Sequence, residues 1–217
     1  MTAAGPALGT PTPESAEPPD SPQAAGGRAR VRPASAWWVL IAGVAGLAAS
    51  VTLTIDKIKI LIDPSYRPSC SINPVLSCGS VMVTPQAEAF GFPNPLIGIV
   101  SFTVVVVTGV LAVAKVELPR WYWVGLAIGT LAGAGFVHWL IFQSLYRIGA
   151  LCPYCMVVWA VTIPLLVVVS SIALQPVLDR GVLRVLYQWR WSITALWFTT
   201  LILLILVRFW NYWSTLI

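Results

Sequence analysis

The chain has 217 residues, of which 58% are apolar and 10% are charged, and its mean hydropathy is +0.82. Soluble domains usually carry about 25% charged residues, so these few charges exclude a soluble protein that covers its apolar surface with polar groups. The net charge of +5 does not indicate a nucleic-acid partner, because the Lys and Arg residues lie mostly at the ends of apolar stretches. The composition predicts an integral membrane protein, since lipid is itself apolar.

The chain begins with a polar segment, residues 1–35, that is rich in Pro, Ala, Ser, Thr, Glu and Gly. This segment lacks the apolar periodicity needed for folding, and we expect a disordered tail. The first long apolar run starts near Ala36, which is too late and too long for a signal peptide.

Five apolar stretches follow the tail, and each is close to the roughly 20 residues that cross a bilayer as a helix. They cover residues 36–55, 95–115, 121–142, 153–174 and 193–213. The predicted fold class is therefore an all-α integral membrane protein.

The basic residues are unevenly divided between the two sides of the predicted membrane. Eight lie on the side of the N-terminus: Arg28, Arg30, Arg32, Lys115, Arg120, Arg180, Arg184 and Arg190. Five lie on the other side: Lys57, Lys59, Arg67, Arg147 and Arg208. The excess predicts a cytoplasmic N-terminus, although Lys57 and Lys59 directly follow the first span. Residues 56–94 then form a long extracytoplasmic loop.

All four cysteines fall on the extracytoplasmic side in this topology. Cys70 and Cys78 lie in the long loop, and Cys152 and Cys155 lie at the outer end of the fourth span. This is the side of a membrane on which disulfides form and persist. A chain with so much apolar material has no obvious need of disulfides as staples.

The sequence Leu151-Cys152-Pro153-Tyr154-Cys155 places a C-x-x-C at the start of a helix. One helical turn brings the two thiols close enough to alternate between dithiol and disulfide. Pro suits the first helical position, and the helix N-terminus favours a thiolate at Cys152. Two alternatives stay open. One is half of a zinc site completed by Cys70 and Cys78. The other is a structural disulfide, although so short a loop adds little stability.

The second pair, Cys70 and Cys78, is separated by eight residues. On a continuous helix this spacing gives about 12 Å of rise, beyond the reach of a disulfide. The Asn73-Pro74 step breaks a helix, so a loop could close the distance. Alternatively, one cysteine faces an outside partner and the other faces the C-x-x-C.

This arrangement of a C-x7-C loop followed by a C-x-x-C resembles the vitamin K epoxide reductase family, particularly its bacterial members, over residues 37–174. Residues 92–98, with Asn94, resemble the family's quinone-site segment. The resemblance implies a four-helix transmembrane bundle around a quinone over residues 36–174. Residues 175–217 would add a cytoplasmic linker and a fifth transmembrane helix. Many bacterial members carry a thioredoxin-like domain after this helix. The chain stops at Ile217 without one, so we expect a separate thioredoxin-fold partner.

The resemblance also implies roles for individual residues. Cys155 would be the cysteine next to the quinone, Cys152 would exchange with Cys78, and Cys70 would help to take electrons from the partner. The implied quinone-site residues are Asn94, which would hydrogen-bond a quinone oxygen, Val81 and Met82, which would cap the pocket, Ile97, and Trp159, which stands where the vertebrate enzymes have Tyr.

Other residues allow a functional and a structural interpretation. His138 lies within the third span, where it could relay protons to a quinone or bond a neighbouring helix. We expect Asp56 and Asp63 to lie in water at the membrane interface. The Trp residues near the span ends are typical of an aromatic belt. Four glycines in the third span favour close helix packing, namely Gly125, Gly129, Gly133 and Gly135.

The predicted function is a membrane thiol–quinone oxidoreductase. It would reoxidise a DsbA-like extracytoplasmic thiol oxidase and pass the electrons to menaquinone or ubiquinone. The predicted location is the bacterial cytoplasmic membrane, with the active site on the extracytoplasmic face. One alternative is a thiol-driven reductase of a quinone or of vitamin K epoxide. The other is a non-enzymatic membrane scaffold with structural disulfides.

Overall fold

The computed structural model describes residues 29, 31–175 and 181–215. Apart from isolated bridge residues, the regular structure in these residues is helical. Five helical segments are long and apolar enough to cross a membrane. They are α1 (Pro33–Ile62), α3 (Asn94–Val113), α4 (Arg120–Phe142, continued by the π-helix η2, Gln143–Ile148), α5 (Pro153–Ala173) and α6 (Gly181–Arg208). The predicted all-α membrane fold is confirmed.

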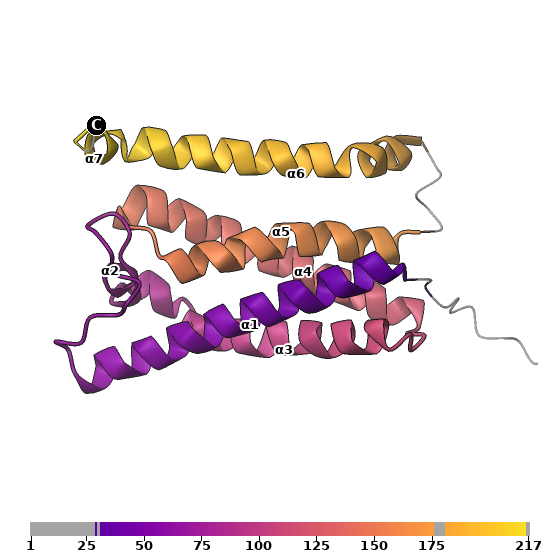
Figure 1. Cartoon of the computed structure of the whole chain (residues 1–217), viewed down its shortest axis with the longest axis horizontal. Coiled ribbons are helices and arrows are strands. Elements are labelled where there is room, and N and C mark those ends of the chain that lie inside the picture. The colour runs from indigo at the N-terminus through magenta and orange to yellow at the C-terminus, as the bar shows by residue number, and fades with distance from the viewer. Residues whose placement is uncertain (1–28, 30, 176–180, 216–217) are drawn as a thin grey trace, which may run out of the picture.

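The arrangement of these helices is shown in Figure 1. Helices α1, α3, α4 and α5 form a bundle, and α6 runs alongside it. The short helix α2 (Cys78–Met82) lies at one end of the bundle, where α5 begins. The 3-10 helix η1 (Pro85–Glu88) links α2 to α3, and α7 (Trp210–Trp213) follows α6.

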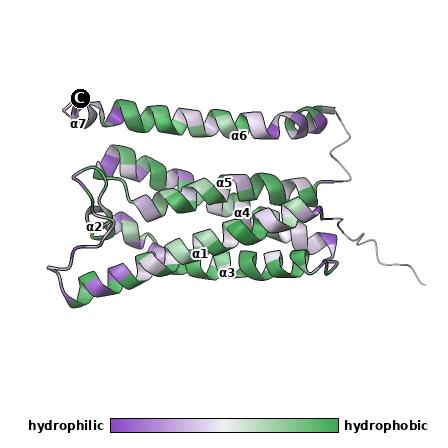
Figure 2. Ribbon diagram, viewed as in Figure 1, coloured by the Kyte–Doolittle hydropathy of each residue, from purple (hydrophilic) through white to green (hydrophobic). Residues whose placement is uncertain are grey.

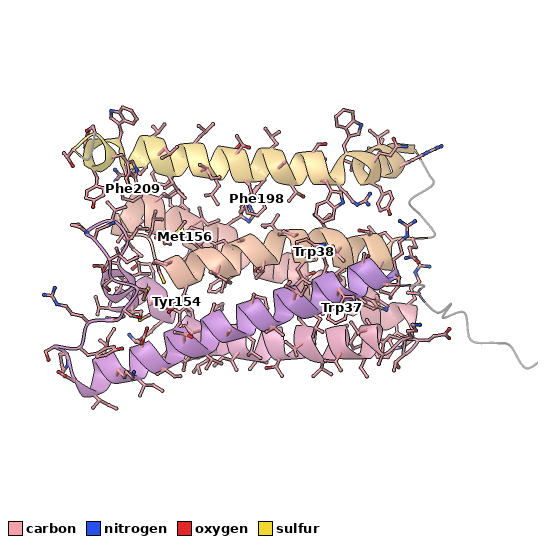
Figure 3. The ribbon with its side chains drawn as sticks, in the orientation of Figure 1. Trp37, Trp38, Tyr154, Met156, Phe198 and Phe209 are labelled. Atoms are coloured by element: carbon pink, nitrogen blue, oxygen red, sulfur yellow. A yellow bond between two sulfur atoms is a disulfide. The ribbon has the colours of Figure 1, made fainter. Side chains whose placement is uncertain are left out.

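Figure 2 shows that the long helices are mostly hydrophobic along their length and more hydrophilic towards their ends. Trp37 and Trp38 are about half exposed and lie near the end of the bundle opposite α2 (Figure 3). Exposed apolar shafts with aromatic residues near their ends are typical of helices in lipid.

Helix α1 is longer at its C-terminal end than the predicted span of 36–55. It continues through Asp56 and Lys57, which are 5% and 7% exposed and share its inward face with Leu53. Each charge has a partner, because Tyr66 donates to Asp56 and Lys57 donates to the Met82 carbonyl. The expectation that Asp56 lies in water is therefore wrong.

The predicted polar tail also differs from the structure at its boundary. The helix begins at Pro33, and Ala29 and Val31 pack against the bundle core. Residues 1–28 and 30 lie outside the described residues. The predicted linker is partly helical, since α6 begins at Gly181, while residues 176–180 lie outside the described part of the chain.

The closest helix contact is between α1 and α3, and glycines make it possible. A Cβ atom on Gly43 would come 2.9 Å from the backbone nitrogen of Val106. A Cβ atom on Gly109 would come 2.6 Å from Cα of Leu40. The four glycines of α4 have no neighbouring atom within 4 Å of such a Cβ position. The predicted close packing at these α4 glycines is therefore wrong.

Candidate redox site

A short backbone pairing joins the long loop to the start of α5. Leu76 and Leu151 form an isolated parallel bridge. The Ser77 N–H donates to the Leu151 carbonyl at 2.9 Å, and the Leu151 N–H donates to the Val75 carbonyl at 2.7 Å. Leu151 directly precedes Cys152, and Leu76 lies two residues before Cys78, so this pairing brings Cys78 next to Cys152.

A turn at Asn73 brings together Cys70 and Cys78, the loop pair. The Asn73 side-chain oxygen accepts hydrogen bonds from the backbone N–H groups of Val75 and Leu76, at 3.0 and 2.7 Å. This turn reverses the chain, and Cys70 and Cys78 form a disulfide with their Cα atoms 5.6 Å apart. The loop closure that Asn73-Pro74 allowed in the sequence is thus the arrangement in the structure.

Cys152 lies between Cys78 of the loop and Cys155 of its own C-x-x-C. Its Sγ atom is 3.3 Å from Sγ of Cys78, and it also accepts a hydrogen bond from the Cys155 backbone N–H at 3.4 Å as the N-cap of α5. A hydrogen bond from the Cys155 thiol, with backbone N–H groups of the first turn, lowers the pKa of Cys152 although burial opposes this. The geometry and the hydrogen bonds to the sulfur both favour a reactive thiol at Cys152, although the Asp56 charge opposes the lowering of its pKa.

Cys155 faces a different environment, an apolar cavity of about 560 Å³ that is lined by α1, α3, α4 and α5 and bordered at one end by its cover, α2 and η1. Cys155 lines this cavity, whereas Cys152 is buried and is not among its lining residues. Five more of the predicted quinone-site residues line it: Val81, Met82, Asn94, Ile97 and Trp159. One cysteine of the C-x-x-C thus contacts the loop disulfide and the other faces the cavity.

Asn94 is the first residue of α3 and links that helix to the cover of the cavity. Its amide nitrogen donates to the Gln86 carbonyl at 2.7 Å, and its oxygen accepts from the Ala89 N–H at 3.0 Å. The N-cap of α3 is Pro93, so the Asn94 side chain holds the η1 segment instead of capping its own helix. One amide hydrogen remains for a ligand.

The structure does not bring His138 to this cavity. His138 lies on the face of α4 that is turned towards α6, where it lines a second hollow with Trp197. Its Nε2 atom accepts from the Trp197 indole N–H at 2.8 Å, and its Nδ1 atom is 2.7 Å from the Ala134 carbonyl. Both ring nitrogens are occupied, so the alternative of a bond to a neighbouring helix describes its position.

Two features of the site were missed in the sequence. Lys57 lines the cavity, and Gly125, Gly129 and Gly133 form part of its α4 wall. The spacing of Leu53 and Lys57, four residues apart on one helix, was the signal that could have placed Lys57 on the inward face. The described residues contain no group of three or more His, Cys, Asp or Glu side chains that could hold a metal ion, so the zinc alternative has no ligand set there.

The loop disulfide contacts the C-x-x-C at the end of a transmembrane helix, and this contact is close enough for thiol–disulfide exchange between the two pairs. The chain belongs to the vitamin K epoxide reductase family, whose model matches residues 37–170. No curated protein matches the chain. Family membership makes it a thiol-dependent quinone oxidoreductase of the membrane, and the match covers the four-helix bundle but not α6.

Proposed function

We propose that this protein reoxidises a separate, DsbA-like thioredoxin-fold protein outside the cytoplasm and passes the electrons to a membrane quinone, menaquinone or ubiquinone. The observation behind this proposal is the continuous series of sulfur atoms. Cys70 is bonded to Cys78, Cys78 contacts Cys152, and Cys155, one turn away, faces the cavity.

The first step is thiol–disulfide exchange at the loop pair. Cys70 is 6% exposed and Cys78 is fully buried, which makes Cys70 the more accessible sulfur. A partner thiolate attacks Cys70, and Cys78 leaves as a thiolate. The partner's second thiol then displaces Cys70, so the partner gains the disulfide and the loop pair gains both electrons.

The second step transfers these electrons to the C-x-x-C pair. The Cys78 thiolate attacks Cys152 of a Cys152–Cys155 disulfide, and Cys155 leaves. Cys70 then attacks Cys78 and releases Cys152, which restores the loop disulfide. The product is the arrangement in this structure, with Cys70–Cys78 joined and Cys152 and Cys155 free.

The third step discharges the C-x-x-C dithiol into the cavity. A bound quinone supplies a two-electron, two-proton acceptor. The Cys152–Cys155 disulfide forms as both thiols give up their electrons and protons, so no other reductant is needed. The chain contributes orientation: the apolar walls exclude water, and the remaining amide hydrogen of Asn94 is available to hold a ring oxygen.

The orientation in the membrane is part of the same proposal. The helix ends near the four cysteines lie at the opposite end of the bundle from the start of α1 (Figure 1). The excess of basic residues on the side where α1 starts supports a cytoplasmic location for that end and an extracytoplasmic location for the cysteines.

The test is anaerobic quinone reduction by the purified protein in lipid, driven by a reduced DsbA-like protein. We expect the native protein to consume quinone and Cys155→Ser to lose the activity by about a thousandfold, because no second electron route leads from Cys152. Cys155→Ser should still trap a mixed disulfide between Cys78 and Cys152, which separates a broken relay from a misfolded protein.

The same assay distinguishes the alternatives. Consumption of an epoxide at a rate comparable to that of quinone would favour the alternative of a thiol-driven vitamin K epoxide reductase. No consumption with any partner or with dithiothreitol would contradict the proposal. In that case both cysteine pairs would be structural disulfides of a scaffold.

A further inference from the structure

The cavity contains one formal charge among the described residues that line it, and this charge belongs to Lys57. The remaining lining side chains are apolar or neutral. Lys57 is 7% exposed, so water does not screen the charge as it would at a surface. A single buried cation in an apolar cavity calls for a functional explanation.

The position of the Lys57 ammonium is fixed by two partners from the cover of the cavity. Its Nζ atom donates to the Met82 carbonyl at 2.7 Å and forms an ion pair with Glu88 at 2.9 Å. Met82 ends α2 and Glu88 ends η1, so Lys57 ties both cover elements to α1. An ammonium group has three N–H donors, and these contacts use two of them.

Two acidic residues accompany Lys57: Glu88 pairs with its ammonium, and Asp56 precedes it in α1. The Glu88 side chain is 41% exposed, and its charge is therefore screened by water on one side. The neighbouring Asp56 binds the Tyr66 hydroxyl and is not among the residues that line the cavity. Among the described residues, Lys57 is therefore the charged side chain that borders the cavity directly.

We propose that Lys57 is the electrostatic partner of the quinone ring, with its third N–H directed to a ring oxygen that gains negative charge as electrons arrive from Cys155. This inference rests on the proposed function. The bonds and electrons balance as described above: the Cys152–Cys155 bond forms, two electrons enter the ring, and the two thiol protons follow. Lys57 keeps its own proton and stabilises the charge before those protons arrive.

This role differs from a purely structural one, in which Lys57 would only hold α2 and η1 against α1. A clamp would affect every ligand of the cavity equally, because it would only keep α2 and η1 closed. A cation directed at the ring would distinguish ligands by charge. The difference can be measured by binding alone, with no turnover.

The experiment compares two naphthoquinones on the oxidised protein in lipid nanodiscs, by titration calorimetry without any thiol. One is 2-hydroxy-1,4-naphthoquinone, whose ring oxygens carry negative charge at neutral pH. The other is its neutral 2-methoxy ether. We expect Lys57→Met to weaken binding of the anion about tenfold or more and binding of the neutral ether less than twofold. Lys57→Arg should retain the preference for the anion.

Two further variants keep the test decisive if Lys57→Met does not fold. Glu88→Gln removes the counter-charge at a partly exposed position, and we expect the ratio of anion to neutral affinity to rise about threefold. Lys59→Met is the matched control, because Lys59 lies on the same helix, is exposed and contacts the Tyr66 ring instead of the cavity. Lys59→Met should change neither affinity.

Equal losses for both ligands in Lys57→Met, no loss for either, or a fall in the ratio in Glu88→Gln would each overturn the role of Lys57. If the native protein binds both quinones and Lys57→Met binds each of them with the native affinity, this inference is overturned and the proposed function stands. A native protein that binds neither quinone would contradict the quinone cavity itself, and the role of Lys57 with it.

Discussion

Glycines serve opposite purposes in two parts of the bundle. Between α1 and α3 they let two backbones approach, as at Gly109, whose missing Cβ would lie 2.6 Å from Cα of Leu40. On α4, Gly125, Gly129 and Gly133 face space that no protein atom fills, and they line the cavity next to Cys155. Glycine thus allows close helix packing between α1 and α3 and leaves cavity space along α4. The difference depends on whether a neighbouring helix lies against the glycine.

The largest effect should come from filling the packed glycine face. We expect Gly109→Leu to lower the free energy of unfolding by about 3 kcal/mol, because the new side chain meets the backbone of α1, which cannot move aside as a flexible side chain can. Thermal unfolding in detergent measures the change. Gly129→Leu is the control, since its Cβ position is open, and equal losses in both variants would contradict the comparison.

Filling the open glycine face should affect ligand binding instead of folding. The cavity lining follows α4 from Trp121 to Leu140, a rise of about 29 Å, long enough for the tail of a membrane quinone. We expect Gly129→Leu to raise the KM for a long-tailed quinone roughly tenfold and to leave a short-tailed analogue almost unchanged. Steady-state kinetics with the two acceptors measure this difference.

The matched control is Gly135→Leu on the same helix. Gly135 also has open space at its Cβ position, but it lines the second hollow, next to His138, and not the cavity at Cys155. This variant should keep the native KM for both acceptors. A similar rise in KM for Gly135→Leu would indicate that the effect arises from α4 as a whole.

The sequence predicted the parts of this site that depend on local order. The C-x-x-C at the start of a helix placed Cys152 and Cys155 one turn apart, and the Asn73-Pro74 step allowed the loop that joins Cys70 to Cys78. Both follow from short-range geometry along the chain. The division of roles within the C-x-x-C pair came from the family resemblance, because it requires knowing which cysteine faces the cavity.

The parts that the sequence did not predict depend on contacts between distant segments. Asp56 and Lys57 look like an interface pair, and they are buried only because Tyr66, Met82 and Glu88 fold back to meet them. The glycines of α4 match a packing motif, yet no helix closes on them. Charge and spacing along one helix do not specify which neighbour lies opposite.

The smallest effect in this comparison is expected on the outer face of α4, where His138 meets α6. We expect His138→Phe to remove the hydrogen bond from Trp197 and to destabilise the protein by about 1 kcal/mol or less. Quinone reduction should keep its native rate and pH dependence, because the His138 ring lies outside the cavity and both nitrogens are occupied. Thermal unfolding and a pH profile of turnover measure the two quantities. A marked loss of turnover with unchanged stability would instead assign His138 a part in proton transfer, and would require α6 to move away from α4 during the reaction.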